Sequence, residues 1–166
     1  MISKQLLRMR SRFYGAGFAL AVLTFAQSTH AAAIISADLC IYGGTAGGVA
    51  AAVQATRVGR SAVVVEFGRN LGGMTSGGLG ATDIGNKAAI GGIAREFYQR
   101  VARHYAVDSA WRFEKRSDYF QQRGGRSTLA EINAPGAAQW TFEPHVAEAI
   151  LFEMLKEAKV PVHFGQ

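Results

Sequence analysis

The sequence has 166 residues, a length that predicts one domain. Apolar residues make up 49% of it and charged residues 18%, values of a folded globular protein that exclude wholesale disorder. The formal net charge is +6, but four of the basic residues, Lys4, Arg8, Arg10 and Arg12, precede the first acidic residue, Asp38. Without those four, the 18 basic residues fall to 14 against 12 acidic ones, a net charge of +2. We therefore expect no nucleic-acid-binding surface.

Cysteine and histidine are sparse. Cys40 is the only cysteine, which excludes an internal disulfide and a thiolate-rich metal site. The histidines, at positions 30, 104, 145 and 163, include no pair at helical ligand spacing. We expect no metal site, and we interpret Cys40, inside an apolar segment, as a residue that packs in the core.

The first 33 residues have the order of a secretory signal peptide. Residues 1–12 are basic, residues 13–26 are apolar and uncharged, and three alanines, Ala31 to Ala33, follow a polar break. This order predicts export to the periplasm or the medium, with cleavage after Ala31 or Ala33. No two arginines are adjacent, so a Sec-type signal is favoured over a twin-arginine signal. The alternative is an uncleaved anchor helix, although the apolar run is shorter than the about 20 residues that cross a bilayer.

Residues 38–66 have the pattern of a βαβ unit. Residues 38–42 form a short apolar run that predicts a buried strand, and a glycine-rich turn, Gly43–Gly48, follows it. An alanine-rich helix is expected next, with Gly59 as the residue just after its end. Residues 61–65 predict a second strand, and Glu66 stands at its carboxyl end.

This unit predicts nucleotide binding. Glycines before a helix allow a pyrophosphate to approach the backbone N–H groups and the positive end of the helix. Glu66 follows Gly43 at about the spacing where a carboxylate accepts hydrogen bonds from ribose hydroxyls. Thr45 is a departure from the pattern, because it takes the place of a glycine for which we expect an unfavourable positive φ. A purely structural turn is the alternative.

A second glycine-rich segment, GRNLGGMTSGGLG, covers residues 68–80. A plain NAD domain is expected to return to a helix at this point. The segment instead lies where a longer cofactor would continue beyond the first turn. A glycine-rich hairpin without a ligand is the alternative interpretation.

Together these motifs resemble the FAD-dependent oxidoreductases of the glutathione-reductase-like superfamily. The resemblance rests on YGGTAGGVAAA, VVVE, LGGMTSGGLG and GGIAREF within residues 38–103, and more loosely on residues 140–166. Within the superfamily, the sequence is most similar to the secreted bacterial group labelled xanthan lyase-like. Threonine is common there in the place of Thr45.

The resemblance implies an oxidoreductase with FAD as its cofactor. Three stretches are implied to contact FAD: the pyrophosphate turn (Gly43, Gly44, Thr45, Ala46, Gly47, Gly48), the ribose carboxylate (Glu66), and a stretch toward the flavin (Gly72, Gly73, Met74). Thr75 and Ser76 either reach the flavin or cap the turn. No catalytic residue is predicted. An NAD-dependent dehydrogenase or a non-catalytic nucleotide-binding module is the alternative.

We therefore predict an α/β fold: a Rossmann-like FAD-binding βαβ unit with a parallel sheet, incomplete, and a helical, loop-rich insertion. Residues 34–166 would be the N-terminal part of the FAD-binding domain. The inserted segment would cover about residues 106–142. Apolar spacing predicts an amphipathic helix over 92–105. Pro144 suits the first turn of another helix, whose inward-facing residues would be Val146, Ile150, Met154 and Leu155. A strand is expected over 160–164.

The aromatic residues of segment 106–142 allow three interpretations. They could form a cap over the flavin, contacts for a sugar, or a subdomain with a small core of its own. We expect a small-molecule substrate, with a carbohydrate as a candidate. Family members are several times longer, so the resemblance also implies that this chain is an N-terminal fragment, inactive by itself.

Overall fold

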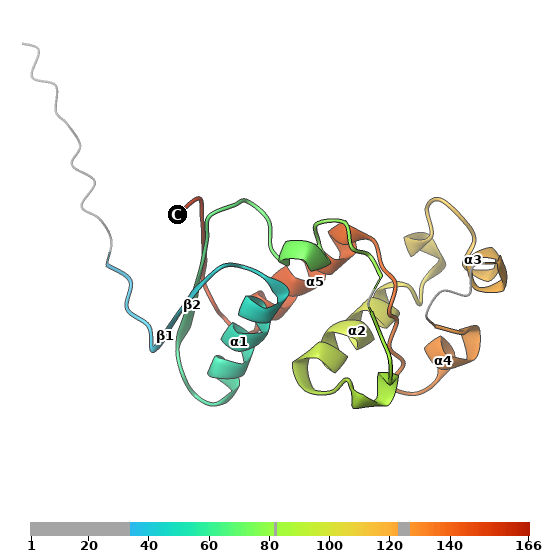
Figure 1. The fold of residues 1–166 in the computed structure, drawn as a ribbon, viewed down its shortest axis with the longest axis horizontal. Helices are drawn as coiled ribbons and strands as arrows, with labels where there is room; N and C mark the ends of the chain where they lie inside the picture. The colour runs from blue at the N-terminus through green and yellow to red at the C-terminus, as the bar shows by residue number, and fades with distance from the viewer. Residues whose placement is uncertain (1–33, 82, 123–126) are drawn as a thin grey trace, which may run out of the picture. The chain divides into compact units, whose positions relative to one another are not determined.

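The elements of the chain follow the predicted strand–helix–strand order. The computed structural model describes residues 34–81, 83–122 and 127–166, and Ile35–Gln166 form one unit. The expected signal peptide lies outside the described residues. In chain order, the elements are β1 (Leu39–Tyr42), α1 (Ala46–Arg57), β2 (Ala62–Glu66), η1 (Gly73–Thr75), η2 (Lys87–Ala89), α2 (Gly92–His104), η3 (Asp108–Ala110), α3 (Arg116–Gln122), α4 (Leu129–Asn133), α5 (Pro144–Glu157) and β3 (Val162–Phe164) (Figure 1).

The three strands form one parallel sheet in the order β1-β2-β3. Leu39 pairs with Ala62, and Val64 pairs with Val162. Because β2 lies between the other two strands, its residues Ala62 to Val64 are buried. Parallel strands need a crossover between them, which α1 supplies between β1 and β2. The predicted α/β fold with a Rossmann-like parallel sheet is confirmed.

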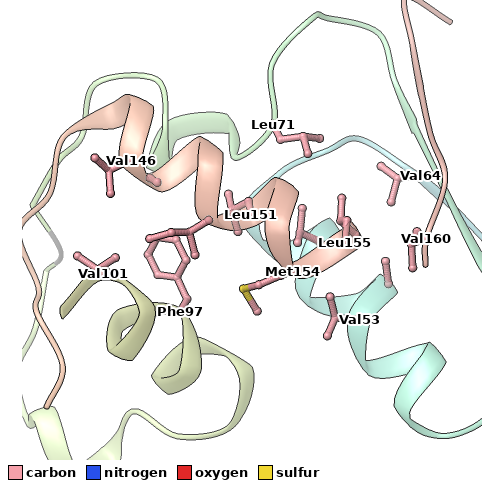
Figure 2. Close-up of a cluster of buried hydrophobic side chains, with 14 of the residues drawn as sticks. Val53, Val64, Leu71, Phe97, Val101, Val146, Leu151, Met154, Leu155 and Val160 are labelled. Atoms are coloured by element: carbon pink, nitrogen blue, oxygen red, sulfur yellow. The ribbon is translucent and has the colours of Figure 1, made fainter. Parts of the chain in front are cut away.

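The hydrophobic core lies where α1, α2 and α5 pack together and against the sheet (Figure 2). α2 contributes Phe97 and Val101, and α1 contributes Val49 and Val53. Pro144 is in the first turn of α5, where its missing N–H removes no helical hydrogen bond. All four residues of α5 that were predicted to face inward are buried: Val146, Ile150, Met154 and Leu155.

The helix boundaries agree with the glycine and apolar signals. α1 ends at Arg57 with Val58 as its C-cap residue, and Gly59 follows with a φ of +79°, the left-handed conformation that glycine adopts after a helix. α2 spans Gly92–His104, one residue short of the predicted end. In the parts of the chain that the structure describes, no helix is long and apolar enough to cross a membrane.

Strand β1 is less buried than its apolar sequence predicts, and Cys40 is exposed. The prediction that Cys40 packs in the core is therefore wrong. β1 is an edge strand, and only Ile41 of its four residues packs against the core. Successive side chains of a strand point to opposite faces, so Cys40 and Tyr42 point away from the face that Ile41 shares with α1.

In its described residues, 106–122 and 127–142, the inserted segment consists of short helices and loops. Trp111 packs against Tyr105, Tyr119 and Phe120, with ring centroids 5.2–5.7 Å apart. At the end of the segment, Phe142 makes an edge contact with Phe97 of α2, at 5.5 Å. The aromatic residues therefore join the segment to the core that α2 and α5 share.

A cluster of charged residues connects α1, α2 and α5. Glu96 accepts hydrogen bonds from Arg57 at 2.7 Å and from Arg100 at 2.9 Å, and Arg100 Nη1 also donates to Glu157 at 2.8 Å. Burial raises the pKa of Glu96, but the two arginines outweigh it, and the pKa lies below its ordinary value. The hydrogen bond from Arg100 lowers the pKa of Glu157 as well.

Candidate functional site

The first glycine loop leads from β1 into α1. Gly43, with a φ of +108°, supplies the left-handed turn that directs the chain away from the strand. Thr45 has an ordinary φ of −66°, and its side chain caps the helix by accepting a hydrogen bond from the N–H of Gly48 at 3.1 Å. The expectation that this position needs a positive φ is therefore wrong, because Thr45 is the N-cap residue of α1.

Three glycines of this loop have different steric roles. A Cβ on Gly48 would clash with the carbonyl oxygen of Gly43, so this glycine permits the close packing of α1 on the turn. A Cβ on Gly44 would lie 2.5 Å from Cδ2 of Leu71. Around Gly47, by contrast, the nearest described atom to a Cβ would be Oγ1 of Thr45, 3.8 Å away. The loop is therefore open at Gly47, in the first turn of the helix.

Glu66 connects the end of β2 to the first glycine loop. Its Oε2 accepts a hydrogen bond from the N–H of Gly44 at 2.5 Å, and its Oε1 accepts one from the N–H of Gly68 at 2.7 Å. The residue is 7% exposed. A carboxylate oxygen has more than one acceptor site, so Glu66 retains capacity for further donors such as hydroxyl groups.

The second glycine loop lies directly beside the first. The N–H of Gly72 donates to the carbonyl oxygen of Gly44 at 2.6 Å, and Gly72 forms an isolated parallel bridge with Thr45. A Cβ on Gly73 would be 3.3 Å from Cγ2 of Thr45. The structure thus brings Gly72 and Gly73 against the first loop, whereas the side chain of Met74 is 77% exposed.

Thr75 and Ser76 have different surroundings. The hydroxyl of Ser76 donates to the carbonyl oxygen of Leu71 and so closes the turn. Thr75 lines a cavity of about 230 Å³ together with Gly47 and residues of α2 and α5. Of the two residues, Ser76 therefore has the capping role and Thr75 faces a space beside the start of α1.

A carboxylate on α5 fixes the second loop, and the sequence did not predict it. Glu148 Oε1 accepts hydrogen bonds from the N–H of Leu71 at 2.9 Å and from Nδ2 of Asn70 at 3.1 Å. Leu71 is fully buried beneath Gly44. Glu148 is 77 positions from Leu71 in the chain, and only the packing of α5 reveals the contact.

Comparison with known families decides the family of the chain and its cofactor. The sequence model of the family described as FAD dependent oxidoreductase matches residues 38–166. The chain belongs to that family. No curated protein matches the chain. The cofactor of this FAD dependent oxidoreductase is FAD, so the family resolves the choice between a flavin and a nicotinamide cofactor that the glycine loops left open.

The site of this FAD dependent oxidoreductase is chemically suited to the ADP half of FAD, which contains the pyrophosphate and the adenosine ribose. The first N–H groups of a helix have no partner within the helix, and they favour an anion together with the helix dipole. α1 has no acidic residue in its first turn to oppose an anion there. The open side of Gly47 gives a phosphate access to these N–H groups. The residues present therefore fit the group that the family requires.

Proposed function

We propose that the chain binds FAD through the turn Gly43–Gly48 and Glu66, and that Gly72, Gly73 and Met74 follow the cofactor toward its flavin. The hydrogen bond from Gly72 to Gly44 carries this proposal, because it joins the two loops around the open first turn of α1. When bound, the flavin supplies the redox chemistry, accepting the electrons of the substrate.

The residues of the chain bind and orient the cofactor. The N–H groups of Ala46 and Gly47 bind pyrophosphate oxygens, since they point out of the first turn of α1. Glu66 accepts hydrogen bonds from the ribose hydroxyls while it holds Gly44 and Gly68 in place. Thr45 keeps the helix start rigid by capping Gly48. These contacts reach the ADP half of FAD and leave the flavin half to other residues.

Competition between ligands tests this assignment. The purified chain is titrated with FAD, and binding is followed by flavin fluorescence polarisation. We expect ADP to displace FAD, and we expect FMN, which lacks the ADP half, to displace it poorly. Displacement by FMN as effective as that by ADP would contradict the proposed contacts.

We further propose that the protein is exported and that its first 31 or 33 residues are removed. The order of basic head, apolar run and alanines supports this proposal. Mass spectrometry of the protein from a cell-envelope fraction and from the medium should find a chain that begins at Ala32 or Ile34. A chain in the membrane that retains Met1 would contradict it.

A further inference from the structure

The second glycine loop exposes two large apolar side chains, those of Met74 and Leu79, which we refer to as the apolar pair. Their exposed fractions are 77% and 62%. The two residues are close in the structure, because the N–H of Leu79 donates to the carbonyl oxygen of Met74 at 3.3 Å. Gly78, between them, has a φ of +125°, which glycine adopts without strain. One short turn therefore carries both apolar side chains.

The loop is fixed at both ends. The N–H of Gly72 donates to the carbonyl oxygen of Gly44 at 2.6 Å. At the other end, the N–H of Phe142 donates to the carbonyl oxygen of Gly80 at 2.9 Å, and a Cβ on Gly80 would clash with the carbonyl oxygen of Phe142. The turn between these ends is thus held in place with its apolar pair exposed, although burial of apolar surface is favourable.

The loop that carries the apolar pair meets the first glycine loop beyond the point where Glu66 contacts it. Glu66 accepts a hydrogen bond from Gly44, whereas Thr75 lines a cavity together with Gly47, in the first turn of α1. FAD carries its adenosine and its flavin on opposite ends of the pyrophosphate. With the ribose at Glu66 and the pyrophosphate at Gly47, the flavin half extends from the other end of the pyrophosphate, where the second glycine loop lies.

We propose that Met74 and Leu79 together form an apolar contact for the dimethylbenzene end of the flavin ring and so position the ring. This inference rests on the proposed function. The dimethylbenzene end carries no hydrogen-bonding group, so apolar side chains are the contacts that suit it. Methionine is flexible, and its sulfur makes favourable contacts with aromatic rings. Because the loop is already fixed, little conformational entropy is lost when the ring binds.

Titration calorimetry of the purified chain with FAD and with ADP tests this contact. Met74→Gln and Leu79→Asn replace the two apolar side chains by polar ones of similar size, at exposed positions where the fold does not depend on them. The double variant should bind FAD about tenfold more weakly and ADP unchanged, because ADP has no flavin. Met74→Leu keeps an apolar side chain and should bind FAD as the unchanged protein does.

Two further variants are controls. Leu129→Asn makes the same change as Leu79→Asn at an exposed position on α4, and it should alter neither affinity. Phe67→Ala removes an exposed side chain that directly follows Glu66, on the adenosine side of the site. It should leave the ratio of the FAD affinity to the ADP affinity unchanged.

The outcomes separate this inference from the binding of the ADP half. An FAD affinity in the double variant equal to that in Leu129→Asn would overturn the inference. The same conclusion would follow from an equal loss of FAD and ADP affinity, or from a loss in Met74→Leu as large as that in Met74→Gln. Each of these results would leave ADP bound by the first glycine loop and Glu66. Absence of FAD and ADP binding in the unchanged protein would overturn the proposed function and this inference with it.

Discussion

The backbone N–H of Gly72 donates a 2.6 Å hydrogen bond to the carbonyl oxygen of Gly44. The two residues belong to different glycine loops, which β2 separates in the sequence. This hydrogen bond joins the two loops side by side, so that they form one continuous surface at the start of α1. Leu71 is buried beneath Gly44. Residues that maintain this surface should therefore control the affinity for FAD.

Substitutions of two neighbouring glycines should separate binding from folding. In Gly47→Ala the new Cβ has space in the protein but occupies the side that is open to a phosphate, so we expect FAD affinity to fall about tenfold or more. The free energy of unfolding should change by less than about 1 kcal/mol, since alanine favours a helix. Fluorescence titration and urea unfolding measure the two quantities.

Gly48→Ala provides the opposite case. Its Cβ would clash with the backbone of Gly43, which cannot move aside as a flexible side chain can. Overpacking of this kind costs about 1–3 kcal/mol of unfolding free energy. If the unfolding free energy of Gly48→Ala equalled that of Gly47→Ala, α1 would not pack as closely against Gly43 as the structure shows.

Removal of the Glu66 carboxylate should weaken FAD binding. Hydrogen bonds to charged groups contribute about 1.5–3 kcal/mol each, so loss of one with the ribose lowers affinity about tenfold or more in Glu66→Ala. Glu66→Gln should be milder, because one acceptor oxygen remains for Gly44 or Gly68. Dialysis followed by absorbance of the retained flavin measures the effect. Unchanged retention in Glu66→Ala would exclude the ribose contact.

Glu148→Ala should reduce FAD affinity through the second glycine loop. The substitution leaves the N–H of Leu71 without its acceptor and releases Asn70 from α5. Glu148→Gln keeps an acceptor for Leu71 and should recover most of the affinity. Glu153→Ala, on the same helix and more exposed, is the control for the loss of a carboxylate. Equal FAD dissociation constants for Glu148→Ala and Glu153→Ala would show that the contact has no influence on binding.

The Glu96–Arg100–Glu157 contacts should make the free energy of unfolding depend on pH in the acid range. Both carboxyl groups have a pKa below the ordinary value of 4.5 in the folded state. They therefore stabilise the fold above about pH 4.5, and this stabilisation is lost as the pH falls through the folded-state pKa. Arg100→Met should lower the unfolding free energy at neutral pH and make its decline with falling pH shallower.

Urea unfolding at several pH values measures this decline. Arg69→Met, at an exposed position after β2 and outside these contacts, is the control and should keep the pH dependence of the unchanged protein. A decline in Arg100→Met as steep as that in Arg69→Met would mean that Arg100 does not set the two carboxyl pKa values.

Local signals were sufficient to predict the βαβ unit. The turn Gly43–Gly48, the β-branched run that ends at Glu66, and Gly59 after α1 each depend on neighbours in the sequence. The same holds for Pro144 at the start of α5, because a first-turn proline and apolar spacing are properties of one segment. The parallel sheet followed from two strands with a helix between them.

Contacts between distant segments could not be predicted in this way. Glu148 meets Leu71 only because α5 packs beside the second loop, and no periodicity within α5 marks this one glutamate. Cys40 was misplaced because an apolar run does not show whether one or both faces of a strand are covered. Thr45 was misjudged because the glycine pattern gives residue types, whereas the capping role depends on the φ that the turn adopts.

Because Cys40 is exposed, its thiol can be labelled with a fluorescent probe. As the only cysteine of the sequence, it directs a thiol-reactive dye to a single position, three residues before Gly43. A maleimide fluorophore attached there would lie on the strand that leads into the first glycine loop, on the face opposite to α1. Its emission would report the arrival of a nucleotide at the loop without relying on flavin fluorescence, so ligands with no chromophore, ADP among them, could be compared directly with FAD.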